Sequence, residues 1–253
     1  MAKLTDRYEN QNLINLAKDK YEQQQKSTIP SEIVTLTSQG KVYPKNSPLS
    51  TGKIEMRYMT AYDEDILTNP SYIKQGVVLN KLIEALIVSD INIDDLAMVD
   101  KDGLILAARI LSYGSEYPVT VTDPKTNKSL DRTIDLSKIK TKPIEIDSDE
   151  NGEFSYNYND INIKWIFPKV YHEFNTISEF LSIIITEING NRNKSDIDEF
   201  IRYKFLITDS KKFQTYVIDN TPSTLLEYDF EGERGGTFKA GFQIGSDFFW
   251  PNN

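Results

Sequence analysis

Cysteine is absent from the 253-residue sequence, and histidine occurs once, as His172. The first absence excludes disulfides, thiolate metal sites and thiol nucleophiles. The second removes most metal-ligand sets and every serine–histidine arrangement except one built on a single imidazole. His172 lies beside an expected helix start, where a lone imidazole is more often structural or exposed than catalytic. The sequence therefore predicts no cofactor.

Long apolar runs are also lacking, because the longest candidate, Phe180–Ile185, falls far short of the ~20 residues that a bilayer span needs. The opening residues, Met1–Asp6, lack the apolar core of a signal peptide, so we expect cytoplasmic synthesis and no stable membrane insertion. The net charge of −9 argues against a nucleic-acid partner, which would call for a basic footprint.

The charge that is present is unevenly spread. Residues 1–60 carry 9 basic and 6 acidic side chains, residues 61–150 carry 10 and 17, and residues 151–253 carry 10 and 15. A slightly basic start thus precedes an acidic body, which favours steered association with a partner. Hydrophobic residues make up 39% of the chain, with 14 Tyr and 12 Phe, as in a globular protein with an aromatic core.

Residues 1–28 are predicted to form an N-terminal helical arm. Its thin apolar stripe, at Leu13, Leu16, Ala17 and Tyr21, follows helical spacing but is too narrow to hold the helix firmly on its own body. Two interpretations stay open, a loosely attached surface helix and a helix that docks on a partner.

Residues 29–140 are predicted to form a mixed α+β domain. Its elements are a short hairpin of residues 32–37 with 42–43, a strand at 53–59, a helix after Thr60 ending before Asn69–Pro70, helices at 72–88 and 94–111, and a projecting hairpin of strands 117–123 and 130–136. The polar tip of that hairpin, residues 124–128, presents Lys125 and Asn127 as candidate partner contacts.

An acidic linker at 141–152 is expected to precede a smaller C-terminal α+β lobe at 153–253. The lobe should contain a hairpin of residues 154–158 and 161–167, helices at 177–188, 196–207 and 211–218, and a terminal strand within 241–251. The overall prediction is an α+β fold with short antiparallel strands, a helical layer and a projecting β-hairpin, followed by this lobe.

The acidic turn offers a weak calcium-loop candidate. Asp147, Asp149 and Asn151 precede Gly152 in the pattern of the first half of such a loop, but Tyr158 stands where a bidentate glutamate should close it. A solvated turn is the favoured interpretation.

Pairs of carboxylates are frequent among the 38 acids, so a two-carboxylate hydrolase stays open.

Two further segments have a structural and a functional interpretation. Gly232–Gly236 is glycine-rich but lacks the surroundings of a phosphate loop, so a flexible turn is favoured. Phe248, Phe249 and Trp250 are candidate interface aromatics, and core packing is the favoured alternative.

An ordered set of segments between residues 29 and 137 resembles a known family. The segments are Ile29–Ser31, Tyr43–Pro44, Ser47–Arg57, Met59–Thr60, Glu64–Pro70, Lys74–Ile83 and Ala108–Gly114. As a set they resemble the T-even-type bacteriophage baseplate hub and hub-assembly family. Many relatives carry Cys-x-x-Cys at the hairpin tip, where this chain has Asp123–Thr126, so the resemblance implies no metal knuckle here.

The resemblance implies a chaperone-like factor in tail assembly that binds other baseplate hub or tail proteins, without enzymatic activity, in the host cell cytoplasm. The alternative is a permanent hub subunit of the virion baseplate. Self-association stays open. A carboxylate-dependent glycan hydrolase of the tail is a more remote alternative.

Overall fold

The computed structural model describes residues 29–250, so the predicted arm with Leu13, Leu16 and Tyr21 lies outside the described residues. The described part contains seven α-helices and five small antiparallel sheets, four of two strands and one of three. The predicted α+β class is therefore confirmed.

The first sheet pairs β1 (Ser31–Thr35) with β2 (Lys53–Arg57). The predicted pairing of the first strand with residues 42–43 was wrong, because residues 36–47 fold into turns over the helical layer. Gly40, at φ +83°, lies so close to the chain before β2 that a Cβ there would stand 2.4 Å from the Ser50 carbonyl oxygen. The short 3-10 helix η1 (Pro48–Thr51) completes this connection.

The helical layer consists of α2 (Ala61–Leu67), α3 (Pro70–Gln75), α4 (Val78–Leu86) and α5 (Met98–Tyr113), with the 3-10 turn η2 (Ile93–Asp95) before α5. Thr60 and Asp63 form a capping box that starts α2, as the threonine and early acids predict. The predicted helix at 72–88 is instead two helices, because Gly76 adopts φ +70° and ends α3.

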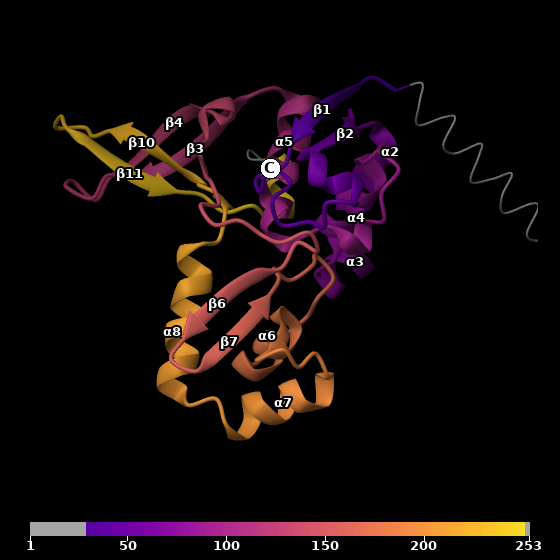
Figure 1. The fold of residues 1–253 in the computed structure, drawn as a ribbon. Helices are drawn as coiled ribbons and strands as arrows, with labels where there is room; N and C mark the ends of the chain where they lie inside the picture. The colour runs from indigo at the N-terminus through magenta and orange to yellow at the C-terminus, as the bar shows by residue number, and fades with distance from the viewer. Residues whose placement is uncertain (1–28, 251–253) are drawn as a thin grey trace, which may run out of the picture.

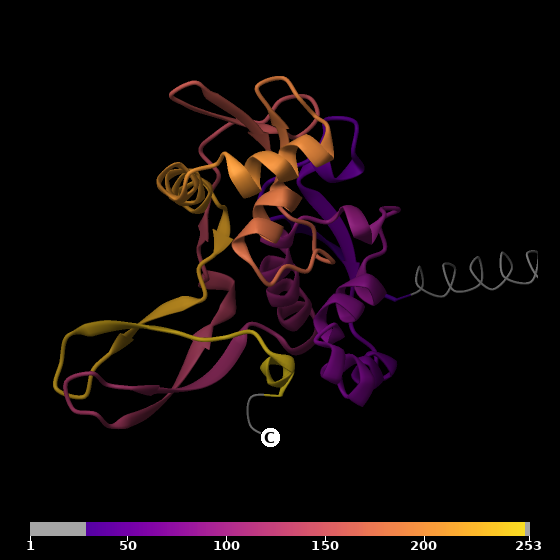
Figure 2. The ribbon, with the colours of Figure 1, turned by 90° about the horizontal axis from the view of Figure 1, so that it is seen from below.

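Two hairpins project from this layer side by side (Figures 1 and 2). The first, β3 (Glu116–Thr122) with β4 (Ser129–Asp135), confirms the predicted projecting hairpin. The second, β10 (Glu227–Glu231) with β11 (Thr237–Gly241), places the glycine-rich segment 232–236 at a hairpin turn. We call the two hairpins together the β-arm.

The chain between the two hairpins forms the lower part of the molecule in Figure 1, which we call the lobe. Its three-stranded sheet orders β6 (Phe154–Tyr158), β7 (Ile161–Trp165) and β8 (Ile185–Ile188), and α6 (Ile177–Ile184), α7 (Lys194–Tyr203) and α8 (Ile207–Asp219) surround it. The predicted hairpin and the two later helices are confirmed. The predicted helix 177–188 ends at Ile184, where the chain becomes β8.

The segment 141–152 joins the lobe to the rest of the molecule. After the turn η3 (Leu136–Lys138), β5 (Thr141–Lys142) pairs with β9 (Ser223–Thr224), and Ile144 is buried. The Lys45 amide donates to the Glu150 carbonyl oxygen at 2.9 Å. One hydrophobic cluster continues from the helical layer into the lobe. The division into domains at 141–152 stays a prediction.

The end of the described chain returns to the helical layer. The predicted terminal strand was wrong: β11 ends at Gly241, and Ser246–Phe249 form the 3-10 turn η4. This turn places two consecutive rings, Phe248 and Phe249, in the core, whereas a strand would point them to opposite faces. Within residues 29–250, no helix combines the length and the apolar character needed to span a membrane.

Candidate interaction surfaces

The β-arm is a thin two-layer sandwich. Its two hairpins each turn one apolar face inward and one polar face outward, as strand alternation requires. Tyr117 and Phe248 lie at its base, with ring centroids 5.0 Å apart, where the arm joins the body. The inward residues are Tyr117, Val119, Val121, Leu130 and Ile134 on the first hairpin and Tyr228, Phe230, Phe238 and Ala240 on the second.

Asp123 links the tips of the two hairpins. Its Oδ1 atom accepts hydrogen bonds from the amides of Lys125 (2.7 Å) and Thr126 (3.3 Å), which shape the first turn. Its Oδ2 atom accepts one from the Glu233 amide (2.9 Å), 110 residues further along the chain. The Lys125 and Glu233 amides hold the pKa of this carboxyl below its ordinary value. We call this arrangement the Asp123 link.

The predicted contacts Lys125 and Asn127 both lie exposed at the linked tip. Asn127 adopts φ +54°, a left-handed conformation that asparagine tolerates. The Lys125 Nζ atom lies 3.5 Å from the Gly235 carbonyl oxygen, and Lys128 pairs with Glu233 at 2.7 Å. The tip is therefore an ordered polar surface made by two distant parts of the sequence.

The predicted aromatic contacts have different surroundings. Phe248 and Phe249 are each 1% exposed, so they belong to the core, which was the favoured alternative, and they offer no surface to a partner in this conformation. The Phe249 ring centroid lies 6.5 Å from that of Tyr113 on α5. Trp250 is only half-buried and stays at the surface.

In the weak calcium candidate, the Asp149 carboxylate binds backbone amides of its own loop. Asp149 accepts hydrogen bonds from the amides of Asn151 (2.9 Å) and Glu153 (3.1 Å) and pairs with Lys164 (2.9 Å). Asp147 lies 4.0 Å from Lys41. Among residues 29–250, no group of three or more acidic or histidine side chains is placed to hold a metal ion.

His172 and Asp100, two titratable residues, both form hydrogen bonds with neighbouring parts of the chain. The Nδ1 atom of His172 accepts a hydrogen bond from the Lys169 amide at 3.1 Å, and burial together with Lys169 lowers the pKa of its imidazole. Asp100 is fully buried, and burial raises its pKa. It accepts hydrogen bonds from the Ser38 amide (2.7 Å) and the Tyr43 hydroxyl (2.6 Å), so it fastens residues 37–43 to α5.

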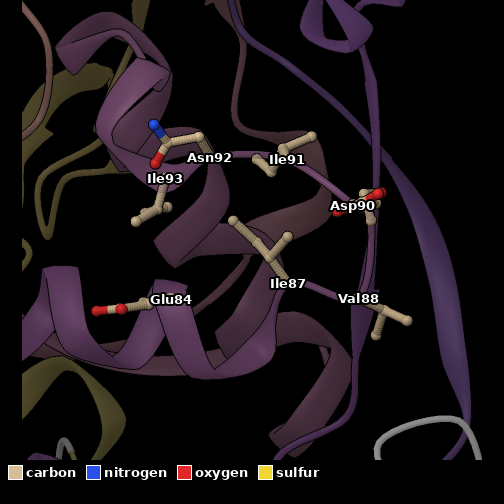
Figure 3. A pocket seen from close by; sticks show the side chains of 8 residues that line it. Glu84, Ile87, Val88, Asp90, Ile91, Asn92 and Ile93 are labelled. Atoms are coloured by element: carbon tan, nitrogen blue, oxygen red, sulfur yellow. The ribbon is translucent and has the colours of Figure 1, made fainter. Parts of the chain in front are cut away.

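A hollow of about 560 Å³ beside α4 contains two carboxylates. Figure 3 shows Glu84 and Asp90 at opposite ends of it, with the apolar side chains of Ile87 and Ile91 between them. A glycoside hydrolase needs two carboxyl groups flanking one bond, about 5–10 Å apart. In this view the Glu84 side chain extends away from Asp90 (Figure 3).

A surface that the sequence did not predict lies where α7 meets α8. Tyr203, Leu206 and Ile207 are 72%, 65% and 73% exposed there. The sequence does contain a sign of this surface, because the predicted helix 196–207 holds more large apolar residues than one helix face can bury. Without the turn at residues 204–206, their outward direction cannot be read from the pattern.

Comparison with protein families gives a match that spans most of the chain. The model of the T4 bacteriophage base plate protein family matches residues 13–229. The matched range includes the helical layer, the first hairpin of the β-arm, the lobe and strand β10 up to Asp229. No curated protein and no solved structure matches the chain.

Proposed function

The chain belongs to the T4 bacteriophage base plate protein family, and from this premise we propose that it is a baseplate hub assembly factor. It acts in a chaperone-like manner, by binding other hub or tail proteins, and performs no catalysis. Its partners are met in the host cell cytoplasm while the tail is assembled. The β-arm tip and the N-terminal residues 1–28 are the proposed docking elements.

The observation that carries this proposal is the Asp123 link. Three backbone amides, two from its own turn and one from the second hairpin, converge on the Asp123 carboxylate at the end of the β-arm. An ordered tip loses little conformational entropy when it docks, which favours a binding role. The tip of the β-arm points away from the body (Figure 2), and its residues Lys125 and Asn127 are exposed.

The surroundings of Glu153 do not suit a general acid of a hydrolase. Glu153 is held by Arg192 through two hydrogen bonds of 2.8 Å, and this pairing keeps the pKa of Glu153 low. A general acid of a hydrolase needs the opposite shift, toward a raised pKa in an open cleft.

The proposal is tested by capture of hub proteins from infected cells with the tagged chain as bait. Lys125→Glu combined with Asn127→Asp should reduce capture at least about tenfold, because charge reversal at a docking tip opposes the partner surface. Lys53→Glu, an exposed charge reversal on β2, is the matched control. Undiminished capture by the tip variant would remove the β-arm tip from the proposal.

The N-terminal segment has its own test. Deletion of residues 1–25 should weaken partner capture and leave the thermal unfolding of the remainder unchanged. Equal capture by the truncated chain would end the docking role of Leu13, Leu16 and Tyr21.

The alternative role, a permanent subunit of the baseplate hub, differs in where the chain is found at the end of assembly. An assembly factor leaves before the particle is complete, whereas a subunit remains. Mass spectrometry of purified virions therefore decides between the two. Stoichiometric presence in finished particles would favour the subunit.

A further inference from the structure

The junction of α7 and α8 presents a preformed apolar knob. Phe205 turns inward, with its ring centroid 5.2 Å from that of Phe200 and 6.3 Å from that of Phe213. The Phe205 amide also donates to the Phe200 carbonyl oxygen at 2.8 Å. This anchored turn leaves the neighbouring side chains of Tyr203, Leu206 and Ile207 exposed to solvent. We call these three side chains the elbow.

The elbow has a basic surround. Between residues 202 and 212 the chain carries four basic side chains and one acid, although the protein as a whole has a net charge of −9. Lys204 pairs with Glu199 at 2.9 Å, and both are largely exposed. An apolar surface with a cationic rim fits an apolar surface with an anionic rim. The basic side chains are Arg202, Lys204, Lys211 and Lys212.

A surface with that complementary chemistry lies beside α2 and α3. It is an open hollow of about 650 Å³, and none of the described residues that line it is basic. Ile73, 48% exposed, and Trp250 supply its apolar surface. Its carboxylates are Glu64, Asp65 and Asp247. We call it the acidic hollow.

The elbow and the acidic hollow cannot satisfy each other within one chain. In both Figure 1 and Figure 2 the junction of α7 and α8 lies in the lobe, whereas α2 and α3 lie on the far side of the helical layer. One surface protrudes and carries basic residues, and the other is hollow and carries acidic residues. Because they lie apart on one molecule, they can meet only between two molecules.

We propose that the elbow of one copy docks into the acidic hollow of a second copy. The contact uses two different surfaces, so it is head-to-tail and can extend from copy to copy into a ring or chain. Leu206 and Ile207 fill the apolar part, and Lys211 faces Glu64 and Asp65. The inference stands apart from the proposed function, since it uses neither the β-arm nor residues 1–28.

The experiment follows self-association by sedimentation at low salt, at concentrations up to about 500 µM because small interfaces associate weakly. The elbow variant combines Leu206→Asp with Lys211→Glu; aspartate is a good N-cap, so α8 keeps its start. The hollow variant combines Asp65→Lys with Ile73→Lys. Wild-type chain should form species that grow with concentration, and each variant alone should associate at least about tenfold more weakly.

Mixing the two variants gives the decisive result. The elbow variant retains an intact hollow and the hollow variant an intact elbow, so the mixture should form a one-to-one dimer and nothing larger. A head-to-head contact would not be restored by mixing. Lys53→Glu is the control for charge reversal elsewhere, and circular dichroism checks that every variant is folded.

Three outcomes would overturn the proposal. They are a wild-type chain that stays monomeric across the whole range, association that survives both variants, and a mixture that forms no dimer. Binding of the monomeric wild-type chain to anionic phosphatidylserine vesicles, lost in the elbow variant, would assign the elbow to a lipid surface instead.

Discussion

The helical layer and the β-arm are both built from short elements, but different interactions hold them. In the layer, the Arg57 guanidinium makes two hydrogen bonds of 2.7 and 2.8 Å to the Asp63 carboxylate, and both side chains are buried. In the β-arm, the Lys128–Glu233 ion pair is open to solvent, with 64% and 39% of the side chains exposed. The ion pair of the layer is buried, whereas the ion pair of the arm is exposed to solvent.

This contrast predicts different sensitivities. A buried ion pair is little screened by salt, and removing one partner leaves an uncompensated charge in the interior. A surface pair contributes little and is screened. We therefore expect mutations to be most costly in the layer, and changes of pH and salt to act first on the β-arm.

The largest effect is expected at Asp63. Burial opposes its ionisation, but hydrogen bonds from Arg57 and Thr60 outweigh it and hold the pKa below its ordinary value. Asp63→Ala strands the Arg57 charge and should lower the free energy of unfolding by about 3–5 kcal/mol. Urea unfolding measures this, and Glu84→Ala, in the exposed pair with Lys81, is the control at ~1 kcal/mol or less. Equal losses would show that burial does not set the cost of breaking an ion pair in this protein.

A smaller effect is expected at Phe248, where the β-arm joins the body. Phe248→Leu should cost about 1–2 kcal/mol, because the shorter side chain leaves part of a buried volume empty against Tyr117. Thermal unfolding measures the loss. Trp250→Leu, at the half-buried neighbour, is the comparison, and an equally large effect there would show that burial does not rank these aromatics.

The Asp123 link should respond to pH. Its pKa lies below the ordinary value of 3.8, so its stabilisation is present above that value and is lost as pH falls through the lowered pKa. Amide exchange at Lys125 and Glu233 should therefore accelerate as pH falls below the ordinary value and through the lowered pKa, while β6 and β7 stay protected. Asp123→Asn should abolish the pH dependence of the tip. Exchange that is independent of pH in the wild-type chain, after correction for intrinsic rates, would contradict this.

The smallest effect is expected at the surface pair of the arm. Lys128→Ala should cost about 1 kcal/mol or less, and the difference from the wild-type chain should vanish in roughly 1 M salt. Differential scanning calorimetry at two salt concentrations makes the measurement. A loss that persists at high salt would mean that the Lys128 side chain stabilises the arm by packing.

The sequence predicted elements whose signals are local. The capping residue Thr60 and the alternation of 130–136 each gave the right type of element. It failed where a distant partner decides. Val42 and Tyr43 were predicted to form a strand. Instead they lie in a turn region, where the Tyr43 hydroxyl donates a hydrogen bond to the buried carboxylate of Asp100.

The same limit applies to the candidate surfaces. Lys125 and Asn127 were correctly placed at a hairpin tip because turn chemistry is local, and their role as partner contacts stays a prediction. The Glu233 amide that completes the tip, and the exposed direction of Leu206 and Ile207, depend on contacts that no spacing encodes. The second hairpin was missed because its turn, 232–236, was interpreted apart from its flanking strands.

The order of the β-arm along the chain has a consequence for synthesis on the ribosome. The first hairpin is complete at Asp135, but its apolar face is covered only when β10 and β11 arrive, after the whole intervening lobe. At ~5–20 residues per second, the face of Val119 and Val121 stays uncovered for roughly 5–20 s in every nascent chain. During that interval neighbouring polysomal chains can exchange hairpins, so translation speed through residues 141–225 should govern the yield of correctly paired arms.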